Sequence, residues 1–197
     1  MVLTDIFIVN FYWIDFAIGI SICLIVTILS KISKIEKFTW YLYWIGFSLG
    51  MCWEFSMIFC TELGIFTFHI YHTPPPTHFM VIVIIHSLWD GGLFLVGYGF
   101  VKKICAKPHF DRFKIKELGI LLIWGQIQEL AVELTSTYSN AWEYVVYWWN
   151  PVLFVFNGQN ITLCPQIIWF IAPIAFYYIA LKLKPRFYEE NKDINQK

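Results

Sequence analysis

Four ionisable side chains lie inside long apolar stretches of this sequence, and no lysine or arginine is near enough along the chain to pair with them. They are Glu54, His86, Asp90 and Glu129, with Asp15 and Glu133 at flanking or shallower positions. A carboxylate in hydrocarbon is costly, so it is usually buried in protein, paired or functional. Without a cation, the remaining partners are a proton, a hydrogen-bond donor, histidine or a metal ion. These residues are therefore candidates for acid–base chemistry.

The composition predicts an integral membrane protein. The 197 residues are 58% apolar, 20% aromatic and only 14% charged, whereas soluble domains contain roughly 25% charged residues. Net charge is zero, and no basic excess indicates a nucleic-acid partner. The first apolar stretch has no basic leader and is too long for a signal peptide, so we expect a retained helix.

Five stretches are long enough to span a bilayer, which takes about 20 mostly apolar residues. We expect them near 7–30, 40–61, 79–101, 117–137 and 165–183, within one transmembrane domain over 1–184. The basic residues fall only in 31–37, 102–116 and 182–197. Positive loops stay cytoplasmic. The sequence therefore predicts an all-α polytopic bundle with an extracytoplasmic N-terminus and a cytoplasmic C-terminus; it identifies neither the membrane nor the oligomeric state.

The segment 142–156 is apolar but short, and Asn150-Pro151 interrupts it. Its aromatic residues suit the membrane–water boundary, so we predict an interfacial or re-entrant element, with a sixth span as the alternative. Polar residues 185–197 are expected to form a disordered cytoplasmic tail. On the outer side, Cys60 ends the second predicted span and Cys164 begins the fifth, so the two would be able to pair in an oxidising compartment. Asn160, on the same side, begins a glycosylation motif.

The ionisable groups fall at one depth in these spans. With a rise of about 1.5 Å per residue, Asp15, Glu54, His86 and Glu129 each lie roughly 10–12 Å below the outer helix ends. His86 and Asp90 are i,i+4 neighbours that can pair. Glu129 and Glu133 have the same spacing, and their mutual repulsion favours a proton on one of them. Gly46, Gly50 and Glu54 share a helix face on which a second helix can approach closely.

A buried acid beside a base is what isomerising or cyclising an apolar substrate requires. We therefore predict an enzyme that performs acid–base chemistry on a membrane lipid or isoprenoid. Glu54 and Glu129 are the candidate acids, and the His86–Asp90 pair is the candidate base. The full predicted site consists of catalytic Glu54, His86, Asp90, Glu129 and Glu133 with substrate-binding Asp15, Trp53, Trp89 and Gln126. Aromatic rings would line the pocket and stabilise a carbocation.

The pair Trp53-Glu54 resembles the fungal integral-membrane terpene cyclases, which carry Trp-Glu on an early helix. The resemblance covers these two residues. Those proteins have more helices, and their late-helix aspartate has no counterpart in 165–183.

Three alternatives to the enzyme remain open. We expect no cofactor, but Glu54, His86, Asp90 and Glu129 offer ligands for a metal ion, with loop residues His69, His72 and His78 above them; the spacing matches no metal signature. Intramembrane carboxylates and histidine also occur in proton-coupled transporters and channels. Finally, the acids would serve as hydrogen-bonding contacts between helices in a non-catalytic scaffold.

Overall fold

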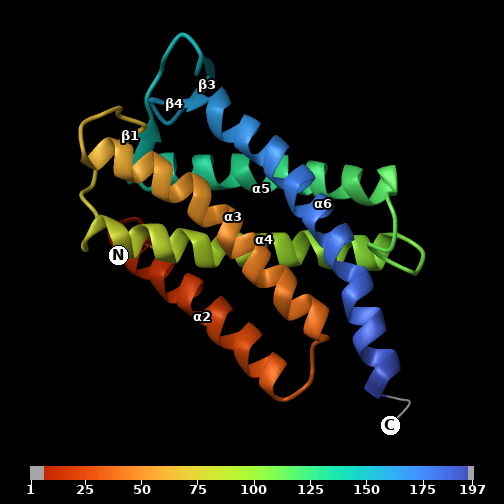
Figure 1. The fold of residues 1–197 in the computed structure, drawn as a ribbon. Coiled ribbons are helices and arrows are strands. Elements are labelled where there is room, and N and C mark those ends of the chain that lie inside the picture. The colour runs from red at the N-terminus through yellow and green to blue at the C-terminus, as the bar shows by residue number, and fades with distance from the viewer. Residues whose placement is uncertain (1–6, 195–197) are drawn as a thin grey trace.

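Among residues 7–194, which the computed structural model describes, five helices are long and apolar enough to cross a membrane (Figure 1). They are α2 (Phe11–Lys31), α3 (Lys37–Glu62), α4 (Phe79–Ile104), α5 (Ile115–Tyr138) and the Leu163–Pro185 part of α6. Each begins and ends within a few residues of a predicted span. The predicted all-α fold is confirmed, and the chain is a multi-pass membrane protein.

The closest helix pair is α3–α4, and glycines make it possible. A Cβ on Gly46 would lie 3.1 Å from the Cα of Gly91, and a Cβ on Gly50 would lie 2.8 Å from the Cβ of Asp90. Side chains at these positions would force the helices apart, as the predicted small-residue stripe implies. Because the backbones approach here, Glu54 one turn beyond Gly50 is brought to α4.

Helix α6 (Leu163–Ile194) crosses α5 at a proline. Pro173 has no N–H to donate to the carbonyl of Trp169, four residues earlier. Gly125 of α5 lies against this carbonyl, where a Cβ would be only 2.7 Å from the oxygen. Where the sequence predicts a disordered tail from residue 185, α6 instead continues to Ile194, since Arg, Glu and Lys after Pro185 favour helix. Residues 195–197 of that tail lie outside the described residues.

The segment 142–156, where the sequence predicts an interfacial or re-entrant element, contributes strands to two antiparallel pairs. Strand β1 (His69–Tyr71) pairs with β2 (Trp142–Tyr144), and β3 (Val152–Phe156) pairs with β4 (Gln159–Thr162). The β3–β4 turn is Asn157-Gly158, and both residues have positive φ, 51° and 79°. This is the two-residue hairpin turn that Asn-Gly favours. Backbone pairing satisfies the polar groups, so this part of the chain needs no sixth span.

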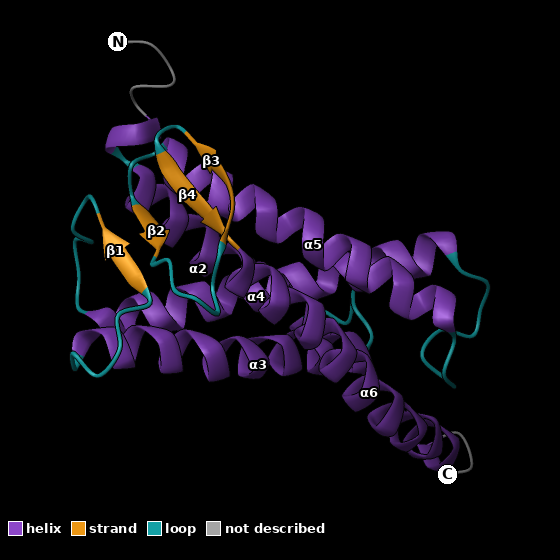
Figure 2. Ribbon diagram, turned by 90° about the horizontal axis from the view of Figure 1, so that it is seen from above, coloured by secondary structure: helices purple, strands orange, loops and turns teal. Residues whose placement is uncertain are grey.

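The strands gather at one end of the bundle, opposite the C-terminus (Figure 2). We call this the strand end. The other end, which holds the loops 32–36 and 105–114 with their lysines and arginine, is the basic end. Sheet β1–β2, which we call the cap sheet, contacts α3 through β1 and α5 through β2. Its position over the helices is what closes the site described next.

Candidate functional site

A cavity of about 400 Å³ lies among the helices beneath the cap sheet. Its lining includes residues of all five spans and of both cap strands. Ligand pockets have volumes of roughly 300–1,000 Å³ and are mostly apolar with a few polar groups. Five of the six ionisable residues that the sequence singles out line this cavity: Asp15, Glu54, His86, Asp90 and Glu129. The predicted convergence of separate spans on one layer therefore occurs in the folded chain.

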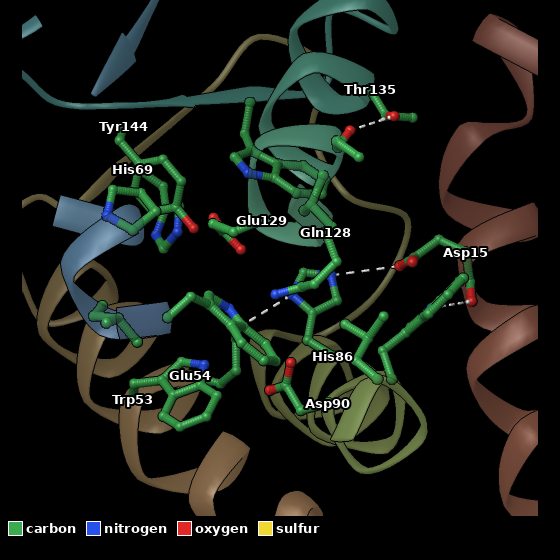
Figure 3. A pocket seen from close by; sticks show the side chains of 18 of the residues that line it. Asp15, Trp53, Glu54, His69, His86, Asp90, Gln128, Glu129, Thr135 and Tyr144 are labelled. Carbon is green, nitrogen blue, oxygen red and sulfur yellow. Dashed lines mark hydrogen bonds and ion pairs between the residues drawn. The ribbon is translucent and has the colours of Figure 1, made fainter. Parts of the chain in front are cut away.

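His86 on α4 lies between two carboxylates from two other helices (Figure 3). Its Nδ1 is 3.2 Å from Oε2 of Glu54 on α3, and its Nε2 is 3.4 Å from Oδ2 of Asp15 on α2. The three side chains are only 12–18% exposed. An imidazole has two nitrogens, and a proton gained at one can be released from the other. The arrangement therefore links Asp15 and Glu54 through a proton-carrying ring.

Asp90 is placed differently from the predicted His86–Asp90 pair. Both ring nitrogens of His86 are directed at other carboxylates, which leaves no nitrogen for the residue one turn away. Asp90 instead packs against Gly50 on α3 and is 6% exposed. Within the described chain, its Oδ2 atom has no hydrogen-bond partner. The i,i+4 spacing places Asp90 near His86, but α2 and α3 supply the acids that the imidazole contacts.

Glu129 and Glu133 lie one turn apart on α5 but have different surroundings. Glu129 is buried and lines the cavity. Glu133, also buried, is outside the lining: it accepts hydrogen bonds from the backbone N–H of Thr162 at 3.3 Å and from Gln166 at 3.2 Å. It thus fastens α5 to the junction of β4 and α6. Of the two glutamates, only Glu129 is in a position to touch a bound molecule.

Gln126, predicted to bind substrate, lies outside the lining as well. Its Nε2 donates to the carbonyl of Gln166 at 2.9 Å, so it joins α5 to α6. The amide that does line the cavity is Gln128, whose Nε2 donates to the carbonyl of Gly125 at 3.1 Å. Its Oε1 has no hydrogen-bond partner within the described chain and is available as an acceptor.

Aromatic side chains make up much of the cavity wall. The predicted Trp53 and Trp89 are among them. Trp89 also donates its indole N–H to the backbone carbonyl of Asp15 at 3.0 Å, which ties α4 to α2. Trp53 packs against Trp169 with ring centroids 5.7 Å apart. The sequence pattern did not single out the other aromatic wall residues, which are Phe7, Phe11, Tyr71, Trp124, Trp142, Tyr144 and Trp169.

The cap sheet supplies four of the wall residues through the alternation of its strands. His69 and Tyr71 on β1, and Trp142 and Tyr144 on β2, line the cavity. Successive strand residues point to opposite faces, so Ile70 and Glu143 between them face away. Pairing sets His69 opposite Tyr144, with ring centroids 4.7 Å apart. The predicted loop histidine is thus a buried part of the site.

Burial controls the protonation of the cap residues. Desolvation lowers the pKa of His69 to about 4, against a smaller opposing effect of Glu54. The same burial raises the pKa of the Tyr144 phenol well above its usual value. Both side chains are therefore neutral at neutral pH. They offer hydrogen bonds to a bound molecule without adding charge.

The ionisable residues of the cavity lining are acids and histidines. Four carboxyl groups and two histidines line the cavity, and none of the described lining residues is a lysine or arginine. Within residues 7–194 no group of three or more His, Cys, Asp and Glu side chains is arranged to hold a metal ion. All five cysteines are free, so the structure does not contain the Cys60–Cys164 disulfide. The chemistry that the arrangement allows is proton donation, proton acceptance and stabilisation of positive charge.

No protein-family model, curated protein or solved structure matches this chain.

Proposed function

We propose that this membrane protein is an enzyme that moves a proton on a lipid or isoprenoid substrate, and so isomerises or cyclises it. The observation that carries the proposal is the single cavity in which four carboxyl groups and His86 meet between aromatic walls. Ionisable groups inside a membrane are costly and mark functional sites by default. Here they line one shared cavity.

Glu129 is the proposed proton donor. It is 4% exposed and projects from α5 into the cavity (Figure 3). The proposed acceptor is the set of Glu54, His86 and Asp15, in which a carboxylate oxygen takes the proton because both ring nitrogens are already directed at the two acids. Moving a double bond adds a proton to one carbon and removes one from another, so donor and acceptor must both reach the substrate. The total number of protons is unchanged, and the His86 bridge gives the removed proton two carboxylates to which it can pass.

The aromatic wall fits the cationic intermediate of such a reaction. Protonating an alkene leaves a positive carbon, and the face of an aromatic ring stabilises a cation within about 6 Å by roughly 0.5–2 kcal/mol. Trp53, Trp89 and Trp142 lie around the ionisable groups, and the ring centroids of His86 and Trp142 are 5.5 Å apart. The carboxylates add further negative potential, and no lining lysine or arginine among the described residues opposes it.

Deuterium transfer tests the proposal even while the substrate is unidentified. The full chain is reconstituted in vesicles of total lipid extract from the source cells, in D₂O, and the lipids are analysed by mass spectrometry. An isomerase or cyclase places a solvent-derived deuteron on carbon of one lipid class. Replacing Glu129 by Gln should lower this incorporation about 10²–10⁴-fold, the usual contribution of a general acid.

Glu133→Gln is the matched control, because Glu133 lies one turn from Glu129 on the same helix but outside the cavity lining. This variant should keep its incorporation rate and lose only stability. If no lipid gains deuterium or changes structure with the wild-type protein, the enzyme proposal fails. Equal losses in the two variants would also contradict it, because they would show that the effect is structural.

A further inference from the structure

One side of the cavity lies between α2 and α5, which pack mainly against other helices and not against each other. Helix α2 packs against α3 and α4, and α5 packs against α4 and α6, so α4 lies between them (Figure 1). In Figure 3, α2 with Asp15 and α5 with Thr135 are on different sides of the cavity. The wall between them is formed by side chains and not by packed helices.

Those wall side chains belong to the outer surface as well. Ile18 of α2 is 39% exposed, and Ile127 and Val132 of α5 are 58% and 38% exposed, yet all three line the cavity. Ala131 and Thr135 on the same face of α5 are exposed lining residues too. A residue that lines a cavity and also faces outward marks an opening. We call these five residues the portal.

The portal lies on helix faces that would meet hydrocarbon in a bilayer. Its residues lie within the spans α2 and α5, which are apolar by composition. The strand end is closed by Tyr71, Trp142 and the other cap residues. Tyr12 of α2 donates its hydroxyl to the carbonyl of Thr73 at 3.0 Å, which anchors the chain above the cavity. The open side of the site is therefore the side on which the bilayer lies.

We propose that a single-chain apolar lipid enters this cavity sideways from the bilayer, between α2 and α5, and keeps part of its chain in the portal while its other end reaches His86 and Glu129. The chemistry at that end rests on the proposed function, whereas entry between α2 and α5 is independent of it. A cavity of about 400 Å³ has the volume of a site for a drug-sized molecule. A longer lipid would thus leave its remaining carbons between the two helices.

Ile127 and Ile123 provide a matched pair for the test. Both are exposed isoleucines on α5, one turn apart, at 58% and 63%, and only Ile127 lines the cavity. The full chain is reconstituted in phosphatidylcholine vesicles that contain a diazirine-bearing isoprenoid alcohol or a diazirine-bearing fatty acid. Samples are irradiated briefly at increasing times after the protein first meets the probe, and peptide mass spectrometry gives the rate at which label appears on cavity residues Trp53 and Met57. Wild type and Ile123→Trp should label alike.

Ile127→Trp should slow labelling about tenfold, which corresponds to an added barrier of about 1.4 kcal/mol. Ala131→Leu is a second, milder block that keeps the test valid if the indole disturbs folding, which size-exclusion chromatography reveals. Unchanged labelling of Trp53 and Met57 in both blocked variants would overturn the portal, and so would the absence of cavity label in wild type. Labelling without deuterium transfer would support the portal while the proposed function fails.

Discussion

His86 shows how a single side chain can join three helices. Its two ring nitrogens lie in one plane and point in opposite directions, towards Glu54 on α3 and Asp15 on α2. Neither carboxylate is close to His86 in sequence. The ring therefore both positions the spans and holds the acids where a substrate would meet them. Its removal would leave buried carboxylates without their partner, which makes it the residue with the greatest effect on this site.

Gly50 is the residue that allows Asp90 to sit between α3 and α4. A methyl group at this position would lie 2.8 Å from the Cβ of Asp90, inside normal contact distance. We expect Gly50→Ala to lower the free energy of unfolding by about 1–3 kcal/mol, the usual cost of overpacking a buried contact. Thermal unfolding in detergent, followed by circular dichroism, measures the loss.

Gly99→Ala on α4 is the control for that substitution. A Cβ at Gly99 has no neighbour within 4 Å, and alanine favours helix over glycine by roughly 0.5–1 kcal/mol. This variant should be as stable as wild type or slightly more so. A Gly50→Ala protein that unfolds at the same temperature as Gly99→Ala would show that α3 and α4 separate freely, against the close packing of these two helices.

At the residue scale, the sequence predicts that the ionisable side chains lie at one depth. It does not predict which side chains contact one another. Hydropathy and helical rise were enough to set Asp15, Glu54, His86 and Glu129 at one level. Spacing along one helix could not separate Glu129 from Glu133, because both lie on nearly the same face and the position of α6 determines which one is covered. The same reason excludes Gln126 from the cavity. Contacts between helices depend on crossing points that no single helix encodes.

At the scale of elements, the two strand pairs are the part that the sequence pattern did not predict. The run Val152–Phe156, the pair Asn157-Gly158 and the run Gln159–Thr162 form a standard hairpin signal. The high apolar content of 142–156 instead favours a membrane element, so the hairpin is not predicted. The β1–β2 pairing has no comparable signal, because Ile70 pairs with Glu143, 73 residues later. Pairing over such a distance is set by the helices that bring the strands together.

The cap sheet should make the protein sensitive to acid through His69. Because burial lowers the pKa of His69 to about 4, the unfolded chain takes up a proton at a higher pH than the folded chain. The stability this provides is full above about pH 6.5 and is lost as pH falls towards 4, with a maximum of about 3 kcal/mol. His69→Phe should remove that loss. Unfolding temperatures of both proteins between pH 7 and pH 4 test this.

Phenylalanine suits the test because it keeps a ring in contact with Tyr144. The two proteins should differ in the slope of stability against pH, not only in its level. If wild type and His69→Phe lose stability in parallel as pH falls, groups other than His69 cause the acid sensitivity, and the closed position of the cap over the cavity is contradicted.

At the scale of the whole molecule, the number of spans and the placement of charge agree. Five of the described helices are of spanning length, and an odd number of crossings would put residues 7 and 194 on opposite sides. The connections at the strand end, residues 63–78 and 139–162, contain no lysine or arginine, whereas the loops at the other end are basic. Since positive loops remain cytoplasmic, the predicted orientation sets the cap sheet outside and the C-terminus inside.

This orientation is testable with two tags on otherwise unchanged protein. A tag after Lys197 should be reached by antibody once the plasma membrane alone is permeabilised, or should be digested by protease added to sealed vesicles with the cytoplasmic face outward. A tag inserted after Pro75, in the loop between β1 and α4, should stay protected. Protection of both tags, or exposure of both, would require an even number of crossings between them. Since α4, α5 and α6 supply three crossings, either result would mean that one of these helices does not span the membrane, and the cavity built between them would then open to water.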